Sequence, residues 1–107
     1  MLIYKIQLPM DTLDVRKIEL PFASIEEVKE HILKIDTQYG IPCAWYQTDV
    51  HESFENINHE YYLIPIGTGH NWGSKLSKEE YLGTALVYDD TLVLHYFLKE
   101  VDGQEIF

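Results

Sequence analysis

Short apolar runs, separated by proline, glycine or polar turns, dominate this sequence and limit its fold more than any other feature. Several runs alternate apolar with polar residues, a pattern typical of a β-strand with one buried face. The predicted strands cover residues 2–8, 15–20, 42–50, 59–66, 81–88 and 91–101. Pro9 and Pro21 end the first two strands, which we expect to form a hairpin, and Asp89 and Asp90 form the expected turn between the last two.

One segment, residues 24–35, has the periodicity of a helix instead. Ser24 and Glu27 match a capping box, in which the serine accepts a backbone N–H bond and the glutamate reaches back. Aliphatic residues then recur at helical spacing, at Ile25, Val28, Ile32 and Ile35. We expect this face to pack on the sheet, and Gly40 to end the helix in a left-handed conformation.

Together these elements predict a single α+β domain over residues 1–107, in the order β-β-α-β-β-β-β. The simplest architecture is one mainly antiparallel sheet with the helix packed on one face. Pro65 predicts an edge position or a bulge for its strand, because proline cannot donate a ladder hydrogen bond. A chain of 107 residues buries enough surface for a core that needs no disulfide or metal.

The single cysteine, Cys43, excludes an internal disulfide and fits a reducing cytoplasm. The N-terminus lacks the basic and apolar regions of a signal peptide. No apolar run approaches the ~18 residues that a membrane-spanning helix requires. We therefore expect a cytoplasmic protein with no membrane partner.

The chain is acidic, with a formal net charge of -10 from 18 acidic and 8 basic residues. Direct binding to nucleic acid requires clustered lysines and arginines, which the sequence lacks. The charge would attract a basic protein partner. Solubility alone also explains it, so both interpretations stay open.

The segment 67–73, Gly-Thr-Gly-His-Asn-Trp-Gly, is the most unusual stretch of the chain. Its glycines let backbone amides approach a ligand closely, and successive N–H groups in such turns can bind an anion. It matches neither the P-loop nor the dinucleotide fingerprint. The alternative is a plain connection between two strands. The candidate ligand-binding residues in this segment are Thr68, Gly69, His70, Asn71 and Trp72.

Aromatic residues are also abundant, with 8 tyrosines and 2 tryptophans. One small core cannot bury all of these rings, so we expect exposed aromatic surface for a ligand, a partner or a second copy of the chain. This predicts a homo-oligomer. Trp45 is a candidate for stacking on a ligand, and His95 is either a hydrogen-bonded sheet residue or a member of a pocket.

The sequence contains no recognisable metal site or catalytic constellation. His51 and His59 flank an acidic loop, but their spacing does not place two ligands on one helix face. Cys43 would need His70 or His95 as a base, and a buried, inert thiol is the common outcome for a cysteine in an apolar strand. We therefore expect a protein that is not an enzyme and uses no cofactor.

Several short motifs resemble a small family of uncharacterised proteins, about this length, from phages and bacteria. They are Pro42-Cys43-Ala44-Trp45, Ile66-Gly67-Thr68-Gly69-His70, Tyr81-Leu82-Gly83-Thr84 and Leu92-Val93-Leu94-His95-Tyr96-Phe97. The resemblance implies a phage or prophage setting, and so the host cytoplasm. Small phage proteins of this sort often inhibit host defence, by binding an enzyme or by sequestering a nucleotide signal.

Two hypotheses follow. The first is a non-enzymatic anti-defence protein that sequesters a nucleotide-like small molecule, with segment 67–73 at the phosphate, His70 as a donor, and Trp72 and Trp45 stacking. The alternative is an acidic inhibitor, a nucleic-acid mimic, that occupies a basic nucleic-acid-binding groove of a host enzyme. The first leaves the net charge of -10 unexplained, and the second leaves the glycine-rich segment unexplained.

Overall fold

The structure, a computed structural model, describes residues 1–49, 58–70 and 76–101. Strands make up 58% of these residues and helices 11%. The strands are β1 (Leu2–Gln7), β2 (Arg16–Leu20), β3 (Ile32–Gln38), β4 (Ile41–Thr48), β5 (His59–Gly67), β6 (Tyr81–Val87) and β7 (Leu92–Glu100). The helices are α1 (Ile25–His31) and a short 3-10 helix, η1 (Lys78–Glu80).

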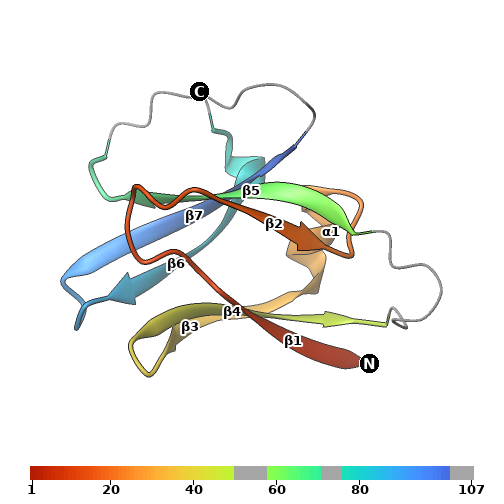
Figure 1. Ribbon diagram of the computed structural model, residues 1–107, viewed down its shortest axis with the longest axis horizontal. Helices are drawn as coiled ribbons and strands as arrows, with labels where there is room; N and C mark the ends of the chain where they lie inside the picture. The colour runs from red at the N-terminus through yellow and green to blue at the C-terminus, as the bar shows by residue number, and fades with distance from the viewer. Residues whose placement is uncertain (50–57, 71–75, 102–107) are drawn as a thin grey trace.

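The strands form two antiparallel sheets, in the orders β1-β4-β3 and β2-β5-β7-β6. The prediction of an α+β fold with a single sheet was therefore wrong, because the described chain is mostly β and has two sheets. Figure 1 shows the sheets as two layers, with α1 near one end of the space between them. Alternation along a strand indicates which side chains share a face, but not which sheet the strand joins.

The first two strands do not form the expected hairpin. Strand β1 pairs with β4, and β2 pairs with β5 in the other sheet. The connection between them is anchored at its start, where the N–H of Leu8 donates to the Pro42 carbonyl at 2.9 Å. The carbonyl of Pro9 accepts a hydrogen bond from Tyr96 at 2.6 Å. These bonds hold the chain where it crosses from one sheet to the other.

The helix is shorter than predicted. Its start is as expected: Ser24 Oγ accepts from the Glu27 N–H at 3.1 Å, and the Glu27 carboxylate accepts from the Ala23 N–H at 3.0 Å. It ends at His31, however, and Ile32 is already extended, with φ -71° and ψ 125°. The predicted helix over residues 24–35 was thus wrong in its second half, where β-branched residues favour a strand.

The Tyr39-Gly40 pair forms the turn of the β3–β4 hairpin and does not end a helix. Gln38 pairs with Ile41 on either side of it, and the φ values of Tyr39 and Gly40 are +51° and +79°. A two-residue turn with both φ values positive is typical of a type I′ hairpin. The left-handed conformation expected of Gly40 is present, but the element that it ends is a strand.

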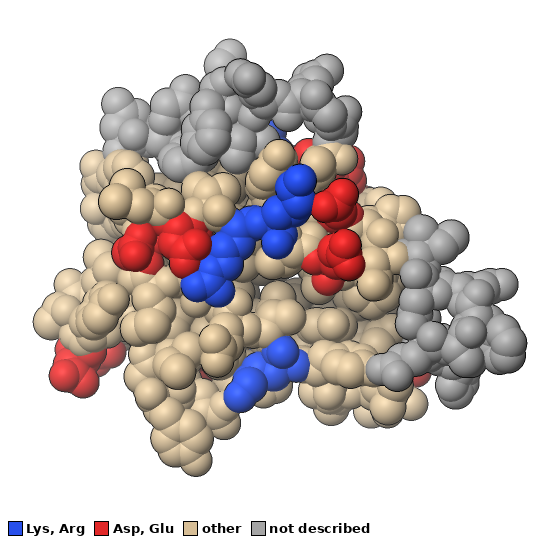
Figure 2. Space-filling view, viewed as in Figure 1, with Lys and Arg blue, Asp and Glu red and all other residues tan. Residues whose placement is uncertain are grey.

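Strand β2 lies at an edge and carries charged side chains, which discourage pairing with another chain. Figure 2 shows a band of Lys and Arg over this face, flanked by acidic side chains. Arg16 bonds the Asp14 carboxylate at 2.6 Å, which lowers the pKa of Asp14 and raises that of Arg16. The pairing of β2 with β5 ends at Leu63, so Pro65 lies on the part of β5 that this edge strand does not reach.

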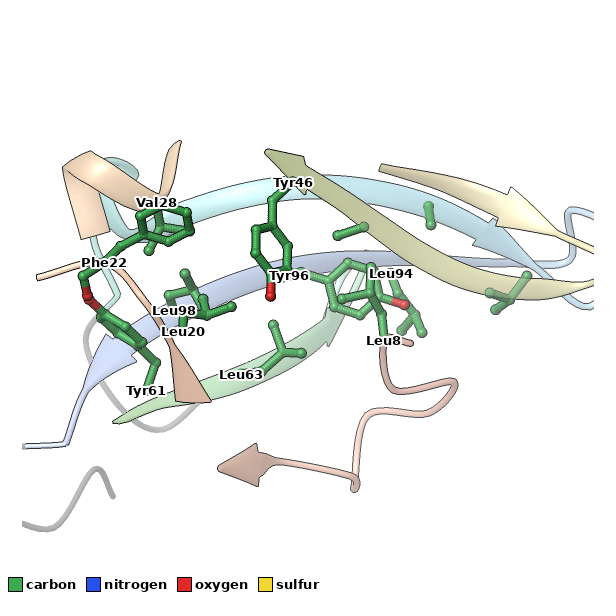
Figure 3. Packing of buried hydrophobic residues seen from close by; sticks show 13 residues of the cluster. Leu8, Leu20, Phe22, Val28, Tyr46, Tyr61, Leu63, Leu94, Tyr96 and Leu98 are labelled. Atoms are coloured by element: carbon green, nitrogen blue, oxygen red, sulfur yellow. The ribbon is translucent and has the colours of Figure 1, made fainter. Parts of the chain in front are cut away.

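The core lies between the two sheets (Figure 3). Leu63, Leu94 and Leu98 of the four-stranded sheet are fully buried there. Two buried tyrosines donate to backbone carbonyls, Tyr96 to Pro9 at 2.6 Å and Tyr61 to Phe22 at 2.5 Å. Burial, with a smaller effect of nearby Glu100 and Glu27, raises the pKa of Tyr61 to about 12. Burial likewise raises the pKa of Tyr96.

The sheets also meet along β3 and β6. Thr37 Oγ1 donates to the Leu86 carbonyl at 2.5 Å. Gly83 lies so close to Ile35 that a Cβ atom on the glycine would overlap Cδ1 of the isoleucine. Ile35 thus contacts Gly83, and Thr37, two residues later, bonds Leu86, three residues after Gly83. The two strands therefore run side by side in the same direction, and their hairpin ends lie at the same end of the molecule.

Candidate functional site

The outer face of the four-stranded sheet carries the candidate site. Leu94, Tyr96 and Leu98 of β7 point into the core, so His95 and Phe97 belong to the opposite face. Register places Ile66 of β5 opposite His95 on one side. On the other side, β6 contributes Thr84 opposite His95 and Tyr81 opposite Phe97.

A chain of hydrogen bonds crosses this face. The Tyr81 and Thr84 hydroxyls bond one another, and Thr84 Oγ1 bonds His95 Nδ1 at 2.9 Å. His95 Nε2 bonds Thr68 Oγ1 at 2.7 Å. In a neutral imidazole one nitrogen donates and the other accepts, whereas hydroxyls do either. The direction of every bond in the chain therefore depends on which nitrogen of His95 carries the proton.

An open pocket of about 440 Å³ adjoins this chain, which we call the His95 pocket. It is lined by Ile66, Gly67, Thr68, Gly69, His70, Leu76, Tyr81, His95 and Phe97. The rings of Tyr81 and Phe97 lie 5.4 Å apart at 58°. Among the described residues that line it, none is an Asp, Glu, Lys or Arg. A mainly apolar wall with a few polar groups, in a volume of this size, is typical of a small-molecule site.

The rim of the pocket is a tight turn at Gly67–His70. The His70 N–H donates to the Gly67 carbonyl at 2.9 Å, and Gly69 has φ +82°. A positive φ at the third of four residues is typical of a type II turn, which requires glycine there. A Cβ at Gly69 would meet nothing within 4 Å, so its backbone conformation requires glycine and crowding does not. The turn itself therefore uses one of the segment's backbone amides, the His70 N–H, which is not available to a ligand.

The structure brings together four of the predicted site residues: Thr68, Gly69, His70 and His95 all line the pocket. Asn71 and Trp72 lie outside the described residues. Trp45 does not join the site, which corrects our prediction. It lies on β4 of the other sheet, between Lys5 and Lys34.

Sequence reasoning missed Tyr81, Thr84 and Phe97. The alternation of Phe97 with His95 was a usable signal, since every second residue of a strand shares a face. The two β6 residues were harder to find, because the register shifts between Tyr81 and Gly83 and breaks the alternation.

The described residues hold no group of three or more His, Cys, Asp or Glu side chains able to bind a metal. Cys43 is buried, and its thiol donates weakly to the Ile41 carbonyl at 3.5 Å. Both ring nitrogens of His95 bond threonine hydroxyls, so the hypothetical pair of Cys43 with His95 is not formed. His51 lies outside the described residues.

Within the described ranges, no helix has the length and apolar character that crossing a membrane requires. The expected homo-oligomer and cytoplasmic location stay predictions.

A family model described as a domain of unknown function, DUF7352, matches residues 1–106. No curated protein and no solved structure matches the chain. Because the match spans nearly the whole sequence, the chain belongs to this family of unknown function, DUF7352.

Proposed function

We propose that the protein is a non-enzymatic binding protein that sequesters a nucleotide-like small molecule in the His95 pocket. One observation carries this proposal: residues from three separate segments, Thr68, Tyr81 and His95, line one pocket and are linked by hydrogen bonds through Thr84. The resemblance to phage proteins supports a role in blocking a host defence signal. Sequestration requires no turnover, so it needs no catalytic residue.

The lining favours the base of such a ligand over its phosphate. Tyr81 and Phe97 offer ring surface against which a planar base can pack. Thr68 and His95 can each present a donor or an acceptor, which suits the polar edge of a base. The part of the pocket wall that the structure describes has no Lys or Arg, and the His70 amide is bonded within the turn. Phosphate groups of the ligand would therefore lie toward solvent.

Calorimetric titration with purine and pyrimidine nucleosides, and with their mono- and cyclic dinucleotides, tests the proposal. Thr68→Val removes the Thr68 hydroxyl, which bonds His95. It should weaken nucleotide binding about ten-fold, the effect of losing one desolvated hydrogen bond. Trp45→Phe, on the other sheet, is the matched control and should bind as the wild type does. The proposal fails if no nucleotide binds and none is released when the purified protein is denatured.

A second depression supports the alternative function, an acidic inhibitor of a basic protein. This depression of about 490 Å³ between α1 and η1 is lined by Ile25, Glu26, Lys29, Glu30, Glu79 and Glu80. Lys29, the lysine among its described lining residues, donates to the backbone carbonyl of Glu79 at 3.3 Å. Changing Glu26 and Glu30 together to lysine should abolish inhibition of the target if this function is correct, and should leave nucleotide binding unchanged.

A further inference from the structure

The ends of two hairpins form a surface that neither the core nor the His95 pocket uses. The β3–β4 hairpin turns at Tyr39, and the β6–β7 hairpin turns at Tyr88. The bond from Thr37 to the Leu86 carbonyl joins the two hairpins two residues before each tyrosine. Figure 1 shows both turns at the same end of the molecule.

Apolar side chains are exposed at these turns. Tyr39 is 95% exposed and Tyr88 55%, and the neighbouring Ile41 and Leu86 are 36% and 44% exposed. None of these four residues lines the His95 pocket. Exposed tyrosines offer large, rigid contact area and are enriched among the residues that dominate protein interfaces.

The backbone at both tyrosines is unfavourable. Tyr39 and Tyr88 have φ values of +51° and +52°, and Asp89 and Asp90 continue at +54° and +66°. Large side chains rarely adopt this left-handed conformation, because Cβ crowds the backbone. Thr91 holds the second turn: its N–H and hydroxyl both donate to the Tyr88 carbonyl, at 3.1 and 2.6 Å. Asparagine or glycine would suit these turns better, so folding alone does not explain the tyrosines.

The charge beside Tyr88 indicates the chemistry of a partner. Asp89 and Asp90 are exposed, and no Lys, Arg or His of the described chain forms an ion pair with either. In Figure 2 acidic side chains lie at the end of the molecule where Figure 1 places the β6–β7 turn, with no basic side chain beside them on that face. An aromatic ring next to free carboxylates matches the guanidinium group, which stacks on rings and bonds carboxylates in a planar fork.

We propose that this hairpin-end surface, formed by Tyr39, Ile41, Leu86, Tyr88, Asp89 and Asp90, binds an arginine-bearing segment of a partner protein. The tyrosine rings pack against the guanidinium planes, and the two aspartates bond their edges. The net charge of -10 attracts such a partner over longer range. Lysine is a weaker match, because an ammonium group is compact and cannot form the planar fork.

Titration of the full-length, ¹⁵N-labelled protein with a capped peptide of alternating arginine and glycine tests the proposal. A lysine–glycine peptide of equal length controls for charge, and a serine–glycine peptide for non-specific contact. We expect amide shifts centred on residues 37–41 and 86–91, and an affinity for the arginine peptide at least about five-fold above that for the lysine peptide. Equal affinity for both basic peptides, or shifts centred elsewhere, overturns the proposal.

Substitutions by asparagine separate binding from folding. Tyr39→Asn and Tyr88→Asn remove the rings and keep a residue that tolerates a left-handed backbone, so both variants should fold and bind the arginine peptide about ten-fold more weakly. Asp89→Asn together with Asp90→Asn should lower the affinity and its dependence on salt. Leu13→Asn is the control, because Leu13 is 91% exposed and lies outside this surface.

Two results would overturn the assignment. One is full binding of the arginine peptide by both tyrosine variants. The other is a wild-type dimer in sedimentation that Tyr39→Asn and Tyr88→Asn convert to a monomer, since a second copy of the chain would then occupy the surface.

Discussion

The two faces of the four-stranded sheet are built from neighbouring residues of the same strands, yet they differ in how their polar groups are bonded. On the inner face, the hydroxyls of Tyr61 and Tyr96 donate hydrogen bonds to backbone carbonyls. On the outer face, Thr84 and His95 bond other side chains that can each donate or accept.

A carbonyl oxygen only accepts, so each inner tyrosine has one arrangement. The hydrogen bonds of the outer face have at least two arrangements. Moving the proton from one ring nitrogen of His95 to the other reverses the direction of its bonds to Thr68 and Thr84. A ligand can therefore select one arrangement of the outer face at little cost, whereas the inner face resists any change. The difference separates the face of the sheet that stabilises the fold from the face at which we propose that a ligand binds.

The largest expected effect is on the inner face. Leu98→Ala should lower the free energy of unfolding by about 2–5 kcal/mol, because it leaves a cavity at a fully buried position. Phe97→Ala, one residue away on the outer face, should cost less, since its ring is only partly buried. Urea denaturation of both variants measures the two losses. Equal losses would show that the outer face is as much core as the inner one.

Removing one hydroxyl from each face sharpens the comparison. Tyr96→Phe leaves the buried Pro9 carbonyl without its donor and should cost about 1–3 kcal/mol. Tyr81→Phe removes a hydroxyl from a part-buried chain and should change stability by no more than about 0.5 kcal/mol. Thermal denaturation compares the pair. A larger loss for Tyr81→Phe would mean that the outer chain is structural.

The margin where β6 meets β3 gives a smaller effect. Gly83→Ala should destabilise the fold by about 1–2 kcal/mol, because the new methyl group overlaps Cδ1 of Ile35. Ile35→Val removes that atom, so the glycine substitution should cost less in this background. A double-mutant cycle in urea measures the difference. Additive losses would contradict the close approach of the two strands.

The smallest effect concerns an ion pair on the outer side of the sheet. Burial acts to raise the pKa of Glu80, but the Ser77 N–H at 2.9 Å and Lys99 Nζ at 3.0 Å bond its carboxylate, and the net pKa is lowered. The stability that Glu80 contributes is therefore present above the pKa of an unfolded glutamate, about 4.3, and is lost as the pH falls through the folded value.

Glu80→Gln should thus cost about 1 kcal/mol at pH 7 and less at pH 3. Denaturation of wild type and variant across this range measures the gap between them. A gap that stays constant with pH would exclude the charged bonds as its source.

Local pattern predicted every described strand except β3, but of their pairings it predicted only the β6–β7 hairpin. Leu94, Tyr96 and Leu98 are buried and alternate with partly buried neighbours, so a short stretch of sequence is enough to predict their strand. Pairing of β1 with β4 depends on residues far away in the chain, which no window contains. The error at Ile32 has a different source. Ile32 and Ile35 fit helical spacing, so the segment reads as a helix when taken alone. The Tyr39-Gly40 turn pairs this segment with β4, and that pairing makes it a strand.

The candidate site was also predicted only in part. Thr68, Gly69 and His70 were predicted because closely spaced glycines indicate a turn. His95 was predicted because it is a polar residue in an apolar strand. Tyr81 and Thr84 reach His95 across a register shift, which leaves no mark in the sequence of β6. Trp45 was misassigned because its strand belongs to the other sheet.

The crossing of the chain between the sheets has a consequence for how the protein is made. On a ribosome, β1 and β2 emerge before the strands they pair with: Leu2 pairs with Thr48 and Arg16 with Leu63, so neither strand has a partner until much later. The β3–β4 and β6–β7 hairpins pair neighbours in the chain and can form as soon as each is complete. Strands β1 and β2 are therefore synthesised before their partners, and they stay unpaired until β4 and β5 have been made.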